Sequence, residues 1–64
     1  MSNNKQITEE VVYEKDYYQE MHGEVRLING VYRCFLTPLF GGDFIEEGRF
    51  ETKEEAIIFM DSIC

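Results

Sequence analysis

The residues best suited to covalent or metal chemistry are one histidine, His22, and two cysteines, Cys34 and Cys64. A histidine beside a cysteine can act as base and nucleophile, provided that the fold also brings an orienting group to the pair. The simpler interpretation is a histidine in a turn and a cysteine buried in the core. Two sulfurs and one imidazole without regular ligand spacing do not specify a metal site. We therefore expect a non-enzymatic protein with no cofactor and no bound metal.

Phosphate and nucleic-acid binding have little support in the sequence. Gly41 and Gly42 are adjacent, but no lysine and no helix start follows them, as a phosphate-binding loop would need. The formal net charge of −7 repels the phosphate backbone of DNA or RNA. We expect a protein partner and no direct contact with nucleic acid.

The strongest local signal is Asn29-Gly30, which stands between two alternating runs and predicts a two-residue hairpin with a type I′ turn. The turn fixes the register of the two strands and places Arg26 directly opposite Arg33. Like charges directly opposite each other destabilise a sheet. The arginine pair therefore needs a physical explanation.

Two interpretations of the arginine pair remain open. In the first, the arginines form a docking site for a partner together with the neighbouring Phe35, since arginine and aromatic residues are typical of interface hot spots. In the second, carboxylates on adjoining strands neutralise the pair in an ordinary surface network. The acids considered for this second role are Glu14, Asp16 and Glu46.

Acidic residues are concentrated in residues 1–24 and 43–64, on either side of a stretch, 25–42, that holds two arginines and no acid. Carboxylates at every second residue of a strand recur at about 6.8 Å, close to the spacing of phosphates along nucleic acid. The acids are therefore expected to imitate a phosphate backbone toward a basic protein groove, although net charge also favours plain solubility. The candidate residues are Glu14, Asp16 and Glu20, together with Glu46, Glu47, Glu51, Glu54 and Glu55.

Length and composition favour a single folded domain of residues 1–64, with residues 1–6 disordered. The hydrophobic content of 44% supports one core, and two cysteines are too few for the disulfide framework of a small secreted protein. We see no signal-like segment, and the longest apolar run, 56–60, is too short to span a bilayer. We expect a cytoplasmic location and no membrane contact.

The segment 7–22 is ambiguous between strand and helix. A threonine followed by two glutamates is typical of a helix start, but the residues beyond alternate as in a strand. We favour the strand because Val and Tyr are enriched. The strand would place Val11 on the inner face with Tyr13 and Tyr17, and the outward set would include Tyr18 and Glu20. A turn at His22-Gly23 would then lead into the hairpin.

The remaining elements follow from local signals. Pro38 ends the third strand because it lacks an N–H, and a fourth strand is expected over 44–50. Thr52 begins a capping box, so a helix should start at Lys53 and run to within a turn of Cys64. The core face of the hairpin is expected to hold Val25, Leu27, Tyr32, Cys34 and Leu36. The apolar stripe of the helix is expected to hold Ala56, Ile57, Phe59, Met60, Ile63 and Cys64.

These elements predict an α+β fold, in which a small antiparallel meander of three to four strands carries one C-terminal helix on one face. The expected function is a small acidic protein-binding module. Its most concrete form is an inhibitor, of the kind carried by phages and other mobile elements, which blocks the nucleic-acid groove of a host defence or DNA-processing protein. The alternative is a structural or regulatory homodimer that associates through exposed apolar groups such as Ile58, which falls on the polar arc of the helix.

Overall fold

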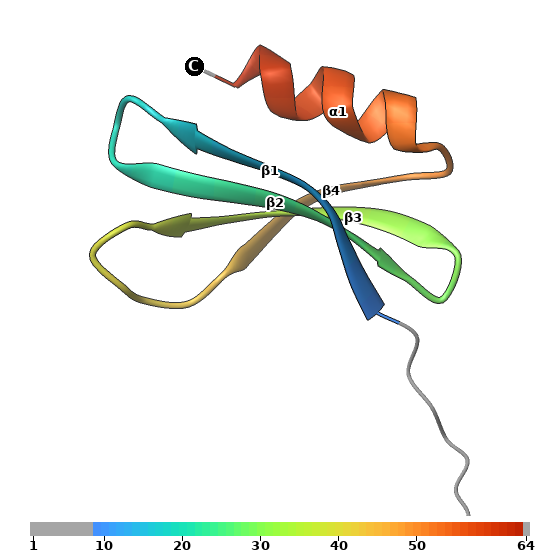
Figure 1. The fold of residues 1–64 in the computed structure, drawn as a ribbon, viewed down its shortest axis with the longest axis horizontal. Coiled ribbons are helices and arrows are strands. Elements are labelled where there is room, and N and C mark those ends of the chain that lie inside the picture. The colour runs from blue at the N-terminus through green and yellow to red at the C-terminus, as the bar shows by residue number, and fades with distance from the viewer. Residues whose placement is uncertain (1–8, 64) are drawn as a thin grey trace, which may run out of the picture.

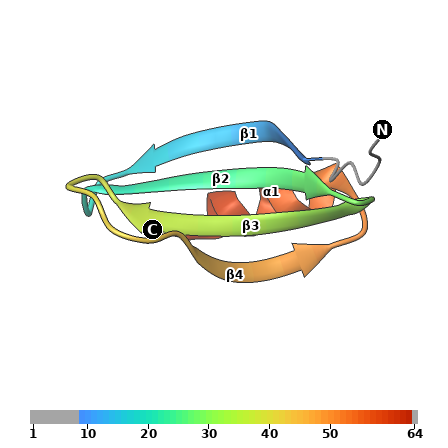
Figure 2. The ribbon, with the colours of Figure 1, turned by 90° about the horizontal axis from the view of Figure 1, so that it is seen from below.

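A computed structural model describes residues 9–63, which form a four-stranded antiparallel sheet with one helix on one face (Figure 1). The strands lie in the sheet in chain order, so β1 and β4 are its two edges, and Figure 2 shows the helix behind the central strands β2 and β3. The predicted α+β meander is confirmed, with four strands. The elements are β1 (Glu9–Tyr17), β2 (Met21–Ile28), β3 (Val31–Pro38), β4 (Ile45–Phe50) and α1 (Lys53–Ser62).

Residues 1–8 and 64 lie outside the described part of the chain, and the predicted disorder of residues 1–6 falls there. No helix among the described residues is long and apolar enough to cross a membrane. The ambiguous N-terminal segment is a strand, as favoured, from Glu9 to Tyr17, and a turn at residues 18–20 follows it.

The β2–β3 hairpin has the predicted turn and register. Asn29 and Gly30 have φ angles of 52° and 83°, as a type I′ turn requires of both central residues. Arg26 pairs with Arg33 across the two strands. The local signal was therefore sufficient to define this part of the sheet.

The turn between β1 and β2 was predicted wrongly. It comprises residues 18–20, where the Glu20 N–H donates to the Tyr17 carbonyl at 3.2 Å and Glu20 adopts a positive φ of 60°. His22 and Gly23 therefore lie within β2. Gly23 is a glycine because α1 packs on it: a Cβ there would lie 2.9 Å from a Tyr17 ring carbon and would also clash with the Met60 methyl group.

An irregularity in β1 changes which face of the sheet its first side chains occupy. The register with β2 shifts between Val11 and Tyr13, so Val11 pairs with Arg26 while Tyr13 pairs with Val25. The extra residue is a β-bulge, which reverses the alternation on either side of it. The prediction that Val11 lies on the inner face is therefore wrong, and its side chain is 42% exposed.

The core lies between the sheet and α1. Val25, Cys34, Ala56 and Met60 have no exposed surface, and the Tyr17 hydroxyl donates to the Met60 carbonyl at 2.6 Å. Of the other predicted core-face residues, Tyr32 and Leu36 pack against this cluster, and Leu27 is half-buried. Burial raises the pKa of the Cys34 thiol to about 11, so this cysteine remains protonated and chemically inert.

The helix begins at the predicted residue because the capping box forms. The Thr52 hydroxyl accepts from the Glu55 N–H at 3.2 Å and donates to the Glu55 carboxylate at 3.1 Å. Ala56 and Met60 are buried under the helix, whereas Ile58 is 68% exposed. The capping box thus fixes where the helix starts.

Replacing Gly23 by alanine is expected to lower the free energy of unfolding by about 1–3 kcal/mol, because the added methyl overpacks the contact with α1. Urea denaturation would measure the change. In a Met60→Leu background, whose side chain lacks the terminal methyl that meets the new Cβ, the cost of the alanine should be smaller. An equal cost in both backgrounds would contradict this explanation.

Candidate functional site

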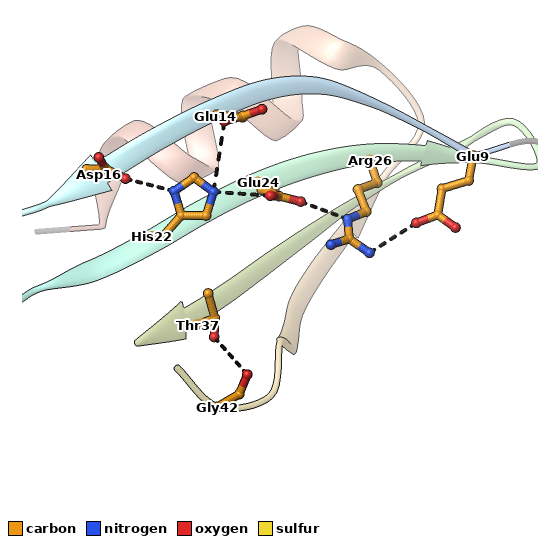
Figure 3. A network of polar contacts seen from close by, with 8 residues as sticks. All are labelled: Glu9, Glu14, Asp16, His22, Glu24, Arg26, Thr37 and Gly42. Atoms are coloured by element: carbon orange, nitrogen blue, oxygen red, sulfur yellow. Dashed lines mark hydrogen bonds and ion pairs between the residues drawn. The ribbon is translucent and has the colours of Figure 1, made fainter. Parts of the chain in front are cut away.

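The sheet face opposite α1 carries a network of charged side chains and aromatic rings. Alternation along β2 places His22, Glu24 and Arg26 on this open face, and β1 adds Glu14 and Asp16 (Figure 3). Contacts between these side chains leave the His22, Glu24 and Arg26 side chains 20%, 14% and 23% exposed. The polar side chains of the open face therefore mostly bind one another.

His22 is the centre of the network. Its Nδ1 lies 2.7 Å from an Asp16 carboxylate oxygen, and its Nε2 lies 3.1 Å from Glu24 and 4.0 Å from Glu14. The hydrogen bond with Asp16 raises the pKa of His22, and the contact with Glu24 adds to this, outweighing the opposing effect of burial. The geometry favours an imidazole that carries positive charge or binds a cation.

Arg26 joins this cluster to the rest of the face. Its Nε donates to Glu24 at 2.9 Å and its Nη1 to Glu9 at 3.0 Å. The guanidinium carbon lies 5.0 Å and 4.6 Å from the ring centroids of Phe35 and Phe44, within cation–π range. Burial alone raises the pKa of Glu24, but the hydrogen bonds from Arg26 and His22 bring it below its usual value.

Arg33 and Arg49 share one carboxylate. Arg33 donates two hydrogen bonds to Glu46, at 3.0 and 2.6 Å, and Arg49 donates a third at 2.6 Å. These bonds lower the pKa of Glu46 to about 2. The neutralisation of the arginine pair by strand carboxylates is thus confirmed for Glu46.

The other acids expected to neutralise the arginines have different partners. Glu14 and Asp16 face His22, whereas Glu9 and Glu24, which the sequence interpretation had not assigned to the pair, hold Arg26. The observed register explains this difference, because it pairs Glu14 with Glu24 and Asp16 with His22. Had the turn lain at His22-Gly23, residue 24 would have been too near it to lie beside Glu14.

The remaining predicted residues lie elsewhere on the surface. Glu20 is in the β1–β2 turn, Phe35 is half-buried beside both arginines, and Ile58 is exposed on α1. We call a separate group, along β4 and the start of α1, the junction acids. They are Glu47, Glu51, Glu54 and Glu55, all exposed, and within residues 9–63 no ion pair joins them to a cation.

An open hollow lies beside the junction acids. Val31 and Phe50 supply apolar lining, and Arg49, Glu51 and Glu55 supply polar lining. Glu55 lies in the first turn of α1, and Glu51 directly precedes the N-cap residue Thr52. This end of the molecule thus presents carboxylates beside a shallow apolar surface.

The open face also offers metal-ligating atoms that the sequence interpretation missed. Glu14, His22 and Glu24 each place one potential ligand atom within 4.8 Å of the others. The relevant sequence signal is a pair of i, i+2 spacings, Glu14 with Asp16 and His22 with Glu24, because residues two apart on a strand share a face. That signal identifies a site only when the register of the two strands is known.

The chain matches no protein-family model, and searches of curated proteins and of solved structures gave no match. The functional inference therefore rests on the chain's own residues.

The ion pairs of Glu46 predict a specific pH dependence of stability. The pKa of Glu46 is about 2 in the folded protein, against 4.5 for an unperturbed glutamate. The ion pairs of Glu46 therefore stabilise the fold fully above pH 4.5, and this stabilisation is lost as the pH falls toward 2. Glu46→Gln should therefore be less stable than the wild type at neutral pH, and the difference should shrink over this window. Denaturant titrations at a series of pH values would measure it.

Glu47→Gln is the matched control, because it removes the same charge from the neighbouring residue, which forms no ion pair within residues 9–63. Its stability difference from the wild type should stay nearly constant over the same window. Similar pH profiles for the two variants would contradict the assignment to Glu46.

Proposed function

We propose that this protein is a small acidic binding module that occupies the basic nucleic-acid groove of another protein and thereby inhibits it. The observation that carries the proposal is that, among the described residues, the cations of the sheet form ion pairs while one group of acids does not. Cations on the described strands have carboxylate partners, while no ion pair within residues 9–63 joins a junction acid to a cation. The paired cations are Lys15, Arg26, Arg33 and Arg49.

The junction acids suit this role better than the acids of β1. Glu14 and Asp16 lie against His22, which offsets their charge, although Glu20 in the adjacent turn has no ion pair within residues 9–63. By contrast, Glu47 lies on the edge strand β4 and Glu51 follows it directly. A basic groove can therefore approach these carboxylates without breaking an ion pair within residues 9–63, although Arg49 and Lys53 lie close by.

The class of target follows from charge and size. A net charge of −7 on 64 residues steers the chain toward strongly basic surfaces, of which nucleic-acid grooves are the commonest large example. The target we propose is a host defence or DNA-processing protein in the cytoplasm, and the chain would be the product of a phage or other mobile element. Small size, acidity and the lack of a catalytic constellation among the described residues support this choice.

Two triple variants test the location of the binding surface. The first replaces Glu47, Glu51 and Glu54 by glutamine, and the control replaces Glu10, Glu20 and Asp43 by the corresponding amides. Both remove three exposed negative charges, so they separate local charge from net charge. Glu55 is kept in both because it belongs to the capping box.

The binding partner would be captured from native cells at low salt, purified, and titrated with each variant. The junction variant should bind on the order of tenfold more weakly, and the control variant should bind nearly as well as the wild type. Wild-type affinity should fall steeply with salt, and DNA should compete. Equal losses for the two variants, or salt-independent binding, would refute the proposal.

A homodimeric structural or regulatory subunit is the second candidate, favoured by large apolar side chains that the fold leaves exposed. Ile58 projects from the polar side of α1, and Phe40 in the β3–β4 loop is 82% exposed. A dimer interface would cover such groups and gain their burial.

Ile58→Lys distinguishes the two candidates. Under the proposed function the chain is a monomer, so this substitution should leave the melting temperature nearly unchanged at every protein concentration. If the chain is a dimer through α1, the variant should melt lower and the wild type should melt higher as concentration rises. Thermal melts over a hundredfold concentration range, together with sedimentation, would decide.

A further inference from the structure

We propose that Glu14, His22 and Glu24 form a binding site for a divalent transition-metal ion such as Zn²⁺. The three side chains come from the neighbouring strands β1 and β2, and their ligand atoms lie within 4.8 Å of one another (Figure 3). This site lies on the open face and involves none of the junction acids, so it goes beyond the function proposed above.

The sheet register sets two carboxylates against each other. Glu14 pairs directly with Glu24, and the next pair is Asp16 with His22. Like charges directly opposite each other on a sheet are destabilising, so a cation between Glu14 and Glu24 would relieve the repulsion between the two carboxylates. The Nε2 atom of His22 points to that position, 3.1 Å from Glu24 and 4.0 Å from Glu14.

The distances fit a small ion. In a tetrahedral site with metal–ligand bonds of about 2.0–2.2 Å, neighbouring ligand atoms lie about 3.3–3.6 Å apart. The two distances from Nε2 bracket this value. The Glu14 side chain is 60% exposed, so it is free to make the short approach that coordination requires.

A proton on His22 satisfies the cluster less completely than a metal ion would. A charged imidazole has two N–H groups, of which one is directed to Asp16 and the other to Glu24, and Glu14 at 4.0 Å has no hydrogen bond from the ring. A metal ion at Nε2 would instead bind Glu14 and Glu24 together.

The charge of the surroundings also favours a divalent ion. The cluster and its neighbours comprise four carboxylates, those of Glu9, Glu14, Asp16 and Glu24, against the guanidinium of Arg26 and the imidazole. Even a positively charged His22 therefore leaves two negative charges uncompensated. A divalent ion bound by a neutral imidazole leaves only one negative charge uncompensated.

Residues around the site hold two of the three ligands in orientation. Asp16 bonds Nδ1 of His22 and so directs Nε2 toward the glutamates, and Arg26 bonds Oε1 of Glu24 and so leaves Oε2 facing the ring. Such outer contacts are characteristic of metal-binding histidines and carboxylates. Imidazole with carboxylate ligands favours Zn²⁺ and Co²⁺ over Mg²⁺ and Ca²⁺, and three protein ligands leave a position for water.

The test is a titration of chelator-treated full-length protein with ZnCl₂, followed by calorimetry and thermal melts, with CoCl₂ absorbance as a spectroscopic report on the ligands. A Cys64→Ser background removes the one thiol outside the described residues. We expect one saturable site, a melting temperature that rises with Zn²⁺, and no displacement by equal Mg²⁺.

His22→Gln should weaken Zn²⁺ binding at least about tenfold, and Asp16→Asn should weaken it through loss of ring orientation. Glu14→Gln should also weaken it, and because this side chain is exposed the variant remains folded and decides the matter if His22→Gln does not fold. Glu51→Gln is the control of equal charge and should bind like the wild type. Absence of saturable binding up to millimolar Zn²⁺, or wild-type affinity in Glu14→Gln, overturns the proposal.

Discussion

One helix of ten residues can cover only one face of a four-stranded sheet, and this constraint shapes the rest of the molecule. The covered face holds the core, where Met60 packs on Gly23 and accepts the hydroxyl hydrogen bond of Tyr17. Within residues 9–63 the opposite face has no second layer, so its side chains form contacts with one another or with water. Its composition is charged and aromatic for that reason.

The open face meets this requirement by pairing charges over aromatic rings. Arg26 lies over Phe35 and Phe44 while Glu24 and Glu9 hold its guanidinium, and Arg33 is held by Glu46. Such partly buried networks order the side chains more firmly than isolated surface pairs do. The acids without cation partners within residues 9–63 lie at the turns, loop and edges of the sheet and on α1, which is why the two proposals concern different surfaces.

The two proposals depend on different arrangements of carboxylates. On the open face, register brings Glu14 and Glu24 together and an ordered imidazole directs a nitrogen toward them, which suits a small cation. At the β4–α1 junction the carboxylates are spread along an edge and a helix start, which suits an extended basic surface. The two proposed sites use different carboxylates, so a substitution in one set leaves the side chains of the other set in place.

The sequence by itself determined the elements whose signals are local. Asn29-Gly30 adopts positive φ at both positions and Thr52 caps α1, because turn and cap preferences act within four residues. Tertiary structure decided the β1–β2 turn and the bulge after Val11. Gly23 looked like a turn residue, but it is a glycine because Met60 needs the space, a contact 37 positions away in the chain. The register, and with it the grouping of Glu14, His22 and Glu24, follows from that packing and cannot be read from neighbouring residues.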